Sequence, residues 1–406
     1  MKQQFIRRIA LILSVLLLLA LASCSVPEDE NKLSDITKPT ATPATDLNAD
    51  AYTAKLEKIK GVLEKYYMGD IDYDKAMEGI YSGLIDSLGD PYTVYFSADE
   101  YKSFTESTNG NYAGVGSTVT TNADGNCEFV KPFKDGPAYN AGILPGDIIC
   151  EIEGEDALGL DLDTVVSKIR GEAGTEVHIK IYRSSISDYM DITVVRGKIE
   201  VPTVEYQMLD NKIGYIIVSE FDMVTESQFI SAIDDLEKQG MKGLIVDLRD
   251  NPGGMLSTVT GMLSRILPKG KLLIYMEDKA GERDEYFSSS NKTVEVPIAV
   301  LINGNSASAS EVFCGCLQDY GVATLVGTKS FGKGIVQSLI PLGDGSALKV
   351  TTSKYFSPLG RNIHGVGFEP DIKVELDPSL KGKASIPIEE DNQLKAAIDC
   401  LMEKIS

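Results

Sequence analysis

Hydrophobic positions recur along this chain with two different periods, and the period changes from one region to the next. Between Ala51 and Leu88 they return every three or four residues, which predicts two amphipathic helices ended by the Gly-Asp-Pro turn at 89–91. Over 110–198 short apolar runs alternate with turn residues, which predicts several strands and one helix at 162–169. Residues 389–405 return to helical spacing and predict a terminal amphipathic helix.

From Lys212 onward, strand and helix patterns alternate. The expected strands are short aliphatic runs, at 213–218, 243–248, 298–302, 323–326 and 335–340. The expected helices are amphipathic, at 225–239, 256–267 and 309–319. This alternation predicts a layered α/β domain around a central sheet, and together with the preceding regions it makes the chain an α+β multidomain protein.

The chain begins with the layout of a secretory signal. A positively charged stretch precedes the apolar run Ile9–Leu21, and no second long apolar run follows it. The run ends in Leu-Ala-Ser-Cys, which resembles a bacterial lipobox, in which Cys24 is lipidated. We therefore expect a lipoprotein signal peptide at 1–23, a flexible tether at 24–48, and lipid anchoring on the extracytoplasmic face of the bacterial cell membrane. The alternatives are a plain signal peptide and an uncleaved anchor helix.

Charge and cysteine content narrow the classes of partner. The formal net charge of -21 argues against binding of nucleic acid or anionic membrane through a basic surface. Five cysteines follow the signal and fit no metal-binding spacing: Cys127, Cys150, Cys314, Cys316 and Cys400. We expect them to be buried as small hydrophobic side chains, although one disulfide remains an alternative outside the cytoplasm.

The segment 303–337 carries the strongest indication of chemistry. Three serines, at 306, 308 and 310, precede an expected helix, and the glycine-flanked Lys333 follows one strand and one turn later. The chain has only His178 and His364, so a Ser-His-Asp arrangement has few candidate members. Because a buried lysine can take the proton from a serine hydroxyl, a Ser-Lys dyad is the leading hypothesis.

Both halves of this dyad have alternative interpretations. Ser308 and Glu311 form an S-x-x-E pattern that is typical of a helix cap, although a nucleophile at that place could also use the Ala309 N–H and the helix dipole. Lys333 could lie on the surface, or it could belong to a nucleotide-binding loop of the form G-x-x-x-x-G-K. In that loop, however, Gly334 stands where a hydroxyl should hold Mg²⁺, and a strand follows instead of a helix.

A second glycine-rich turn follows the expected strand at 243–248. Its sequence, Asp-Leu-Arg-Asp-Asn-Pro-Gly-Gly at 247–254, lies where ligands bind in α/β sheets. The glycines would let backbone N–H groups approach a substrate, and the alternative is an ordinary strand–helix turn.

Residues 136–147, Gly-Pro-Ala-Tyr-Asn-Ala-Gly-Ile-Leu-Pro-Gly-Asp, resemble the signature of PDZ domains. Such domains bind a peptide C-terminus as an added strand. The resemblance implies that the loop Gly114, Val115 and Gly116 holds the tail carboxylate through backbone N–H groups. The alternative is a generic glycine-rich β-turn.

Three motifs together resemble the C-terminal processing peptidases, also called tail-specific proteases. They are S-A-S-A-S-E at 306–311, F-G-K-G-x-V-Q at 331–337 and D-L-R-x-N-P-G-G at 247–254. The similarity extends over nearly all of residues 50–405. It implies four regions: an N-terminal helical segment (49–108), a PDZ domain (109–199), a layered peptidase core of the crotonase-like ββα-spiral type (200–378) and a C-terminal helical segment (379–406).

The resemblance also assigns roles to individual residues. It implies that Ser308 is the nucleophile, that Lys333 is its base and that Gln337 orients the lysine. The Ala309 N–H and a glycine N–H, from Gly253 or Gly254, would form the oxyanion hole. Arg170 would couple the PDZ domain to the active site.

The implied function is a serine endopeptidase that recognises protein C-terminal tails and cleaves through an acyl-enzyme. No metal or cofactor is expected. The expected partners are proteins or peptides with exposed C-terminal tails, and the membrane through the lipid anchor. A homodimer is also possible, because residues 50–105 and the last helix offer surfaces for it. The alternative function is a catalytically silent PDZ scaffold that binds protein C-termini.

Overall fold

The computed structural model describes residues 48–383 and 386–405. The expected signal peptide, Cys24 and nearly all of the expected tether lie outside these residues. The chain divides after Tyr73 into two compact units. Within the described residues, no helix combines the length and the apolar character that crossing a membrane requires.

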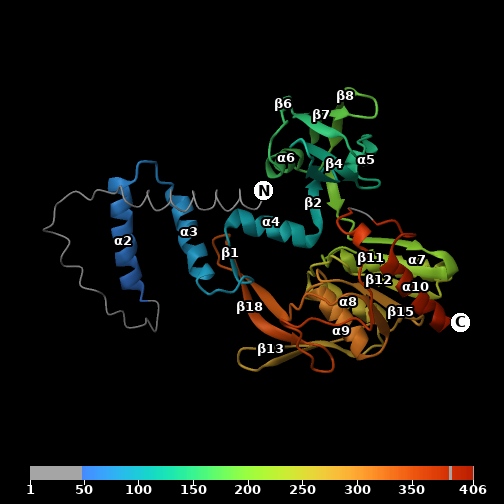
Figure 1. The fold of residues 1–406 in the computed structure, drawn as a ribbon. Helices are drawn as coiled ribbons and strands as arrows, with labels where there is room; N and C mark the ends of the chain where they lie inside the picture. Colours follow the sequence, from blue (N-terminus) through green and yellow to red (C-terminus); the bar gives the residue numbers. More distant parts are fainter. Residues whose placement is uncertain (1–47, 384–385, 406) are drawn as a thin grey trace, which may run out of the picture. The chain divides into compact units, whose positions relative to one another are not determined.

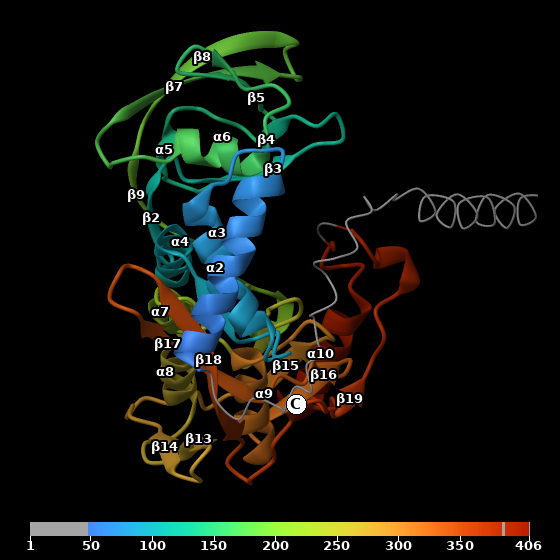
Figure 2. The ribbon, with the colours of Figure 1, turned by 90° about the vertical axis from the view of Figure 1, so that its left-hand side faces the viewer.

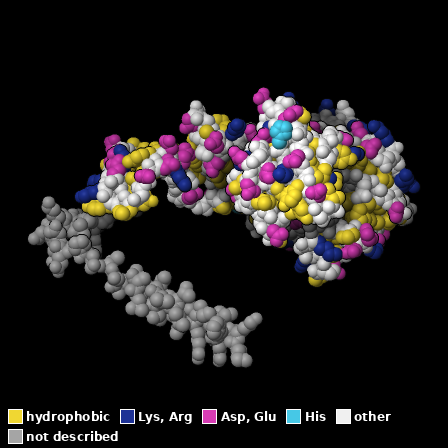
Figure 3. All heavy atoms as spheres, turned by 90° about the horizontal axis from the view of Figure 1, so that it is seen from above, with side chains coloured by type: hydrophobic (Ala, Val, Ile, Leu, Met, Phe, Trp, Pro, Cys, Tyr) yellow, Lys and Arg dark blue, Asp and Glu magenta, His cyan; other side chains and the backbone are white. Residues whose placement is uncertain are grey.

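The first unit contributes one described helix, α2 (Ala49–Tyr66). The Asn48 side chain caps it by accepting hydrogen bonds from Asp50 N and Ala51 N at 3.1 and 3.2 Å. None of its residues is buried. Hydrophobic side chains therefore gather on its surface (Figure 3), as the helical period of the sequence predicts.

The central element of the second unit is a six-stranded sheet (Figure 1). Its strands, in pairing order, are β10 (Val204–Met208), β11 (Ile213–Val218), β12 (Gly243–Asp247), β15 (Ile298–Ile302), β16 (Ala323–Gly327) and β19 (Ile372–Lys373). All neighbours pair in parallel except β10, which runs antiparallel at the edge. Parallel strands must be covered on both faces, which explains why β12 and β15 are buried throughout and apolar up to Asp247 at the end of β12.

Helices cover this sheet on both faces. One face packs against α7 (Thr225–Lys238), α8 (Leu256–Ile266) and α9 (Ala309–Asp319), and the other packs against α10 (Asn392–Ile405). Strand β12 shows the alternation: Leu244 and Val246 belong to the first core, and Ile245 belongs to the second. The predicted α/β layers are thus present. The last helix begins at Asn392 rather than at Glu389, because the Asp391 carboxylate accepts from Gln393 N and Leu394 N and caps it there.

A second sheet packs beside this core and was not recognised as a unit in the sequence. Its strands are β1 (Val94–Phe96), β13 (Leu272–Asp278), β14 (Arg283–Phe287), β17 (Ile335–Pro341) and β18 (Ala347–Phe356). Strand β18 pairs with β1, β13 and β17 along different parts of its length. This long strand brings the 88–93 turn, which leads into β1, to the lysine-bearing loop, which leads into β17.

The PDZ-like region forms its own sheet and core (Figure 2). The sheet contains β3 (Ser117–Thr121), β4 (Cys127–Pro132), β5 (Ile148–Ile152), β6 (Glu155–Asp156), β7 (Glu176–Arg183) and β8 (Asp188–Val195). Two short helices accompany it, α5 (Pro137–Asn140) and α6 (Leu162–Ile169). Helix α6 has the predicted bounds, and Val165 and Ile169 bury its apolar face.

A two-stranded ribbon, β2 (Asn111–Gly114) and β9 (Gly197–Glu200), joins this region to the rest of the second unit. Helices α3 (Tyr73–Asp86) and α4 (Ala98–Asn109) precede the ribbon. A capping box of Ser97 and Glu100 begins α4, and Gly110 ends it in the left-handed conformation. All five cysteines after the signal are buried and free, as expected of small hydrophobic side chains.

Candidate active site

A cavity of about 430 Å³ collects the residues expected to carry the chemistry and the oxyanion hole, except Gly253. Ser308, Ala309, Lys333, Gln337 and Gly254 all line it. Apolar side chains from α4, α8, α9 and the second sheet complete its wall: Phe104, Leu256, Val312, Ile335, Val336, Leu339 and Tyr355. The structure thus brings together residues from segments that lie far apart in the sequence.

The structure separates the three serines that the sequence left equivalent. Ser306 and Ser310 are fully buried, and their hydroxyls donate to the carbonyls of Leu248 and Asn251 at 2.7 and 2.9 Å. Both therefore fasten the start of α9 to the 247–254 turn. Ser308 is only partly buried and is the one of the three that lines the cavity.

Ser308 has a backbone conformation that is uncommon for serine. Its φ is 56°, in the left-handed region, directly before α9. The Ser308 carbonyl accepts hydrogen bonds from Glu311 N, Val312 N and the Tyr355 hydroxyl, which hold the residue in this turn. Strained backbone of this kind is maintained where the surroundings fix it, and it clusters at functional sites.

The glycine turn at 247–254 lies directly against Ser308. A β-carbon on Gly253 would lie 2.7 Å from Ser308 Cβ, and one on Gly254 would collide with the Phe221 carbonyl. The φ angles of the two residues, 109° and 142°, also favour glycine. This close approach explains why two glycines stand side by side.

The two glycines differ in the availability of their N–H groups. Gly253 N donates to the Asn251 side chain at 2.9 Å. The Phe221 N–H donates to Gly253 O, and the Phe221 carbonyl accepts from Met255 N, so the Gly254 N–H takes part in neither hydrogen bond. Among the described residues, neither Gly254 N nor Ala309 N has a hydrogen-bond partner. The geometry therefore favours Gly254, with Ala309, as the pair able to receive an oxyanion.

Glu311 is the buried centre of the site, and the sequence identified it only as part of a helix cap. Its Oε1 accepts from Ser330 Oγ and Gly332 N at 2.6 and 2.7 Å. Its Oε2 accepts from Lys333 N at 2.7 Å and from Ser308 N at 3.0 Å. Burial raises the pKa of Glu311 despite these hydrogen bonds. One carboxylate thus fixes the backbones of both predicted dyad members.

The Lys333 amine does not form a hydrogen bond with the Ser308 hydroxyl in this conformation, as far as the described residues show. Its Nζ lies 4.7 Å from the centre of the Tyr92 ring. Burial lowers the pKa of Lys333, the positive charge of Lys349 lowers it further, and Asp90 opposes this shift. The turn at 88–93 is therefore part of the site, in contact with the lysine.

Gln337 shares the cavity, but its amide has no partner for its nitrogen. The Nε2 atom is buried without a hydrogen bond to any described residue. The structure thus brings Ser308, Lys333 and Gln337 to one cavity without joining them in a hydrogen-bonded chain.

Replacement of Lys349 by methionine should move the pH dependence of peptide cleavage to higher pH. The neutral lysine amine is the proposed base, so activity should rise as Lys333 loses its proton. Removal of the neighbouring positive charge raises the pKa of Lys333 toward its ordinary value, and the rise then needs a higher pH. The measurement is the midpoint of kcat/KM against pH for both proteins. An unchanged or lower midpoint would contradict the predicted coupling.

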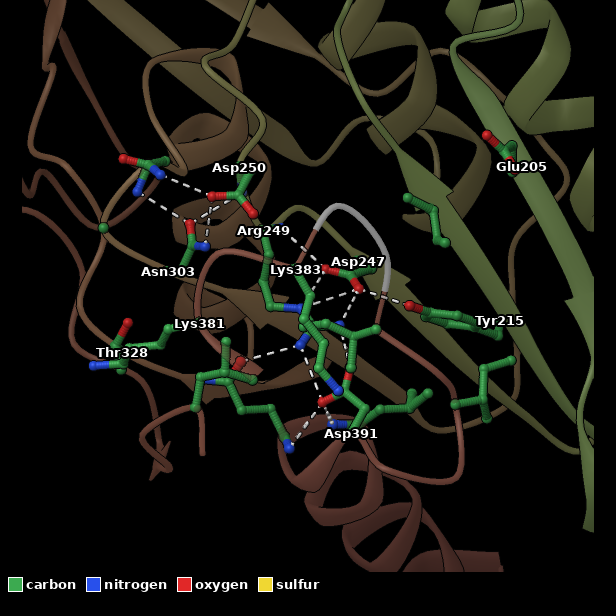
Figure 4. A pocket seen from close by; sticks show the side chains of 18 of the residues that line it. Glu205, Tyr215, Asp247, Arg249, Asp250, Asn303, Thr328, Lys381, Lys383 and Asp391 are labelled. Carbon is green, nitrogen blue, oxygen red and sulfur yellow. Dashed lines mark hydrogen bonds and ion pairs between the residues drawn. The ribbon is translucent and has the colours of Figure 1, made fainter. Parts of the chain in front are cut away.

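The first part of the 247–254 turn has a structural role instead of lining this cavity. Arg249 donates to Asp247 and to Asp391, with its Nη2 2.6 and 2.7 Å from their carboxylates (Figure 4). Asp247 also accepts from the Tyr215 hydroxyl at 2.7 Å. These residues line a separate cavity of about 1100 Å³ that includes neither Ser308 nor Lys333.

An Arg249→Met variant should lose about 3–5 kcal/mol of the free energy of unfolding. The substitution leaves two nearly buried carboxylates, Asp247 and Asp391, without their shared cation, and Asp391 caps α10. Urea unfolding measures the loss. The matched control is Lys395→Met on the exposed face of α10, whose ion pair with Asp399 is open to solvent and should contribute less than about 1 kcal/mol. Equal losses in both variants would contradict the argument.

The predicted tail-binding loop lies at the start of the PDZ-like sheet. Val115 is buried in the core of that region, so its side chain is not available to a ligand. The Val115 and Gly116 carbonyls accept from Ala138 N and Phe133 N, which fixes the loop. Strand β3 follows the loop and pairs with β4 on one side, and within the described chain its other edge has no paired strand. This edge is the kind that a peptide could extend.

Arg170 follows α6 and contacts the segment that leads to the active-site cavity. Its guanidinium lies 4.9 Å from the centre of the Tyr112 ring and 3.9 Å from the Glu106 carboxylate of α4. The same helix contributes Phe104 and Ser107 to the cavity. Arg170 thus contacts a helix that borders the cavity, and its coupling role stays a prediction.

Comparison with known proteins identifies three regions. Residues 212–374 match the model of peptidase family S41, residues 132–183 match a PDZ domain, and residues 20–100 match the N-terminal domain of the activating protease CtpB.

Two curated relatives come from Bacillus subtilis (strain 168). The carboxy-terminal processing protease CtpB is 36% identical over 351 residues, covering 84% of this chain and 73% of that protein. CtpA is 36% identical over 332 residues, covering 82% and 71%. A solved structure of a candidate S41 protease from Bacteroides fragilis aligns with a TM-score of 0.50 at 17% identity, covering 84% of this chain and 93% of that chain.

Proposed function

The chain belongs to peptidase family S41 and is a serine peptidase, and we propose that it cleaves through a Ser308–Lys333 dyad after its PDZ domain has bound the C-terminal tail of a protein. The observation that carries the proposal is the cavity that Ser308, Lys333 and Gln337 share with the free N–H groups of Ala309 and Gly254. Such a cavity combines a nucleophile, a base of lowered pKa and an oxyanion site.

The reaction begins when the neutral Lys333 amine takes the proton from Ser308 Oγ. To do so, the amine leaves the Tyr92 ring and turns toward Ser308. Gln337, whose side-chain nitrogen is buried without a hydrogen bond to any described residue, then hydrogen-bonds to the amine and orients it. Ser308 Oγ bonds to the scissile carbonyl carbon, and the negative charge forms on the carbonyl oxygen. The N–H groups of Ala309 and Gly254 stabilise that charge.

The tetrahedral intermediate collapses when the Lys333 ammonium gives its proton to the leaving amine. The peptide C–N bond breaks and the acyl group remains as an ester on Ser308. A water molecule, deprotonated by Lys333, then attacks the ester and releases the acid product. The Lys333 ammonium gives this proton to Ser308 Oγ as the ester C–O bond breaks, which restores the serine hydroxyl and the neutral amine. No metal or cofactor enters this sequence.

The experiment that tests the proposal compares two forms of one unstructured protein, with a free and with an amidated C-terminus. We expect cleavage of the free form and a higher KM for the amidated form, because the PDZ loop binds the tail carboxylate. Equal KM values would exclude tail recognition. Binding of the free tail without any cleavage would instead support a silent PDZ scaffold.

We also propose that Cys24 carries a lipid that holds the protein on the extracytoplasmic face of the membrane. The support is the lipobox-like Leu-Ala-Ser-Cys sequence. A Cys24→Ser variant should move from the membrane fraction to the soluble or uncleaved pool, and unchanged lipid labelling would reject the proposal.

Helix α2 supports a further proposal, that two copies of the chain associate through it. Its exposed apolar residues include Ile59, Val62 and Leu63, and it has no buried residue of its own. A Val62→Glu variant should shift the mass measured by light scattering from dimer to monomer. A monomeric wild-type protein would reject this proposal.

A further inference from the structure

We propose that Asp222 and Glu220 form a subsite, within the cavity that contains Ser308, for the cationic side chain of a lysine or arginine of the substrate. Both acidic residues line the same cavity as Ser308 and Lys333. The inference rests on the proposed peptidase function and adds a sequence preference to it, which the family match and the dyad do not supply.

Asp222 differs from every other buried acidic residue of the described chain. Its residue exposure is only 6%. The other buried acidic side chains are each paired: Asp147 with Arg183, Asp247 and Asp391 with Arg249, and Glu311 with four donors. Within the described residues, the Asp222 carboxylate has neither a hydrogen bond nor an ion pair. Its oxygens are not among the fully buried side-chain atoms without a partner, and Asp222 lines the cavity, so a ligand in the cavity could supply the partner that the described residues do not.

The two lysines of the cavity do not supply that partner. Lys333 lies over the Tyr92 ring, and Lys349 lies 5.4 and 5.5 Å from the centres of the Phe96 and Phe104 rings. Among the ion pairs of residues 48–383 and 386–405, none joins either lysine to Asp222 or Glu220. The cavity therefore contains separate cationic and anionic groups.

The anionic group is held firmly next to the proposed oxyanion site. Phe221, between the two acidic residues, donates to Gly253 O at 3.0 Å and accepts from Met255 N at 2.7 Å. The Asp222 carbonyl accepts from Thr258 Oγ1 of α8 at 3.0 Å. A cation bound here would thus belong to a substrate residue close to the scissile bond.

The electrostatics of the two carboxylates favours a cationic partner. Burial, with a further contribution from Glu220, raises the pKa of Asp222 to about 7. Burial also raises the pKa of Glu220. A lysine ammonium or an arginine guanidinium would favour the ionised carboxylates and form charge-assisted hydrogen bonds with them. An uncharged side chain of equal size would leave the Asp222 carboxylate without a partner.

The test uses short peptides that span one cleavage site of reduced, alkylated casein. Lysine and norleucine, an uncharged analogue of similar size, replace one another at each position flanking the scissile bond. At one of these positions we expect lysine to raise kcat/KM about 10- to 100-fold over norleucine. Absence of a lysine preference at every position would overturn the proposal, and this arm needs no variant protein.

An Asp222→Asn variant of the full chain should remove the lysine preference, so that the ratio of kcat/KM for the lysine peptide to that for the norleucine peptide falls to within about twofold of one. The matched control is Asp210→Asn, an exposed acidic residue outside the cavity, which should keep the preference. Equal slowing of both peptides by Asp222→Asn would overturn the subsite, because the residue would then contact something common to all substrates.

A binding measurement separates this proposal from the proposed function. Fluorescence anisotropy of the two peptides is measured with the Ser308→Ala protein and with the Ser308→Ala/Asp222→Asn protein. Tighter binding of the lysine peptide that the second substitution abolishes supports the subsite, even if wild-type protein cleaves nothing and the peptidase proposal fails. Equal binding of both peptides overturns the subsite, even if wild-type protein cleaves them.

Discussion

Ser308→Ala and Lys333→Met should each lower the rate of peptide cleavage about 10⁴-fold or more, and the double variant should be no slower than either single one. The serine supplies the bond to the substrate, and the lysine supplies the proton acceptor that makes this bond possible. Because neither group acts without the other, their losses do not add. The measurement is the cleavage of an unstructured protein with a free C-terminus by the three variants and the wild type.

The serine neighbours provide the control for this prediction. Ser308→Ala keeps the β-carbon in the same left-handed turn, so the free energy of unfolding should stay within about 0.5 kcal/mol of wild type. Ser310→Ala should instead lose about 1–3 kcal/mol, because the Asn251 carbonyl is left without the buried hydroxyl. Full activity of Ser308→Ala would show that another residue is the nucleophile and would end the dyad assignment.

Glu311→Gln should lower kcat about 10²-fold or more, although the side chain keeps its size. All four partners of the carboxylate are donors, from Ser330, Gly332, Lys333 and Ser308. A glutamine amide offers one acceptor oxygen, so its NH₂ group would face the N–H of Gly332 in one orientation and the N–H groups of Lys333 and Ser308 in the other. The backbones of the nucleophile and the base would then shift apart, and chemistry is sensitive to such displacements.

The same variant should also lose stability, by about 2–4 kcal/mol of unfolding free energy, since unsatisfied buried donors are costly. An exposed control, Glu295→Gln, should change neither quantity. To separate positioning from general destabilisation, kcat and KM are measured well below the unfolding transition of the variant. A fall in kcat with little change in KM is expected, whereas wild-type kcat would show that Glu311 only stabilises the helix start.

Much of the fold follows from the sequence because its layers depend on local periodicity. The alternation of β11, α7, β12 and α8 was predicted within about a residue or two at each end. These elements have continuous apolar strands or one-sided helices, and their pattern is clear within a short window. The second sheet was missed, because β13, β14 and β18 are half-exposed and pair with segments distant in sequence.

The candidate site, like the fold, was predictable from the sequence only in part. Its chemistry was visible in the sequence, since a serine run before a helix, a glycine-flanked lysine and few histidines favour a Ser-Lys pair over a Ser-His pair. The choice of serine rested on family resemblance alone. The tertiary structure distinguishes the serines physically. The hydroxyls of Ser306 and Ser310 are buried and donate to carbonyls of the 247–254 turn, which lie 58 and 59 residues earlier in the chain.

The sequence by itself determined the layered fold, the family and the residue types that carry the chemistry, because these depend on periodicity and on motifs within single segments. Only the tertiary structure decided how those residues are used. It showed that Gly253 N is already bonded and that one Glu311 carboxylate holds the backbones of Ser308 and Lys333. It also showed that, within the described part of the chain, Gly254 N and the carboxylate of the nearly buried Asp222 have no partner. Each of these findings depends on contacts between groups that are distant in sequence, because such contacts decide which polar groups are hydrogen-bonded and which are buried.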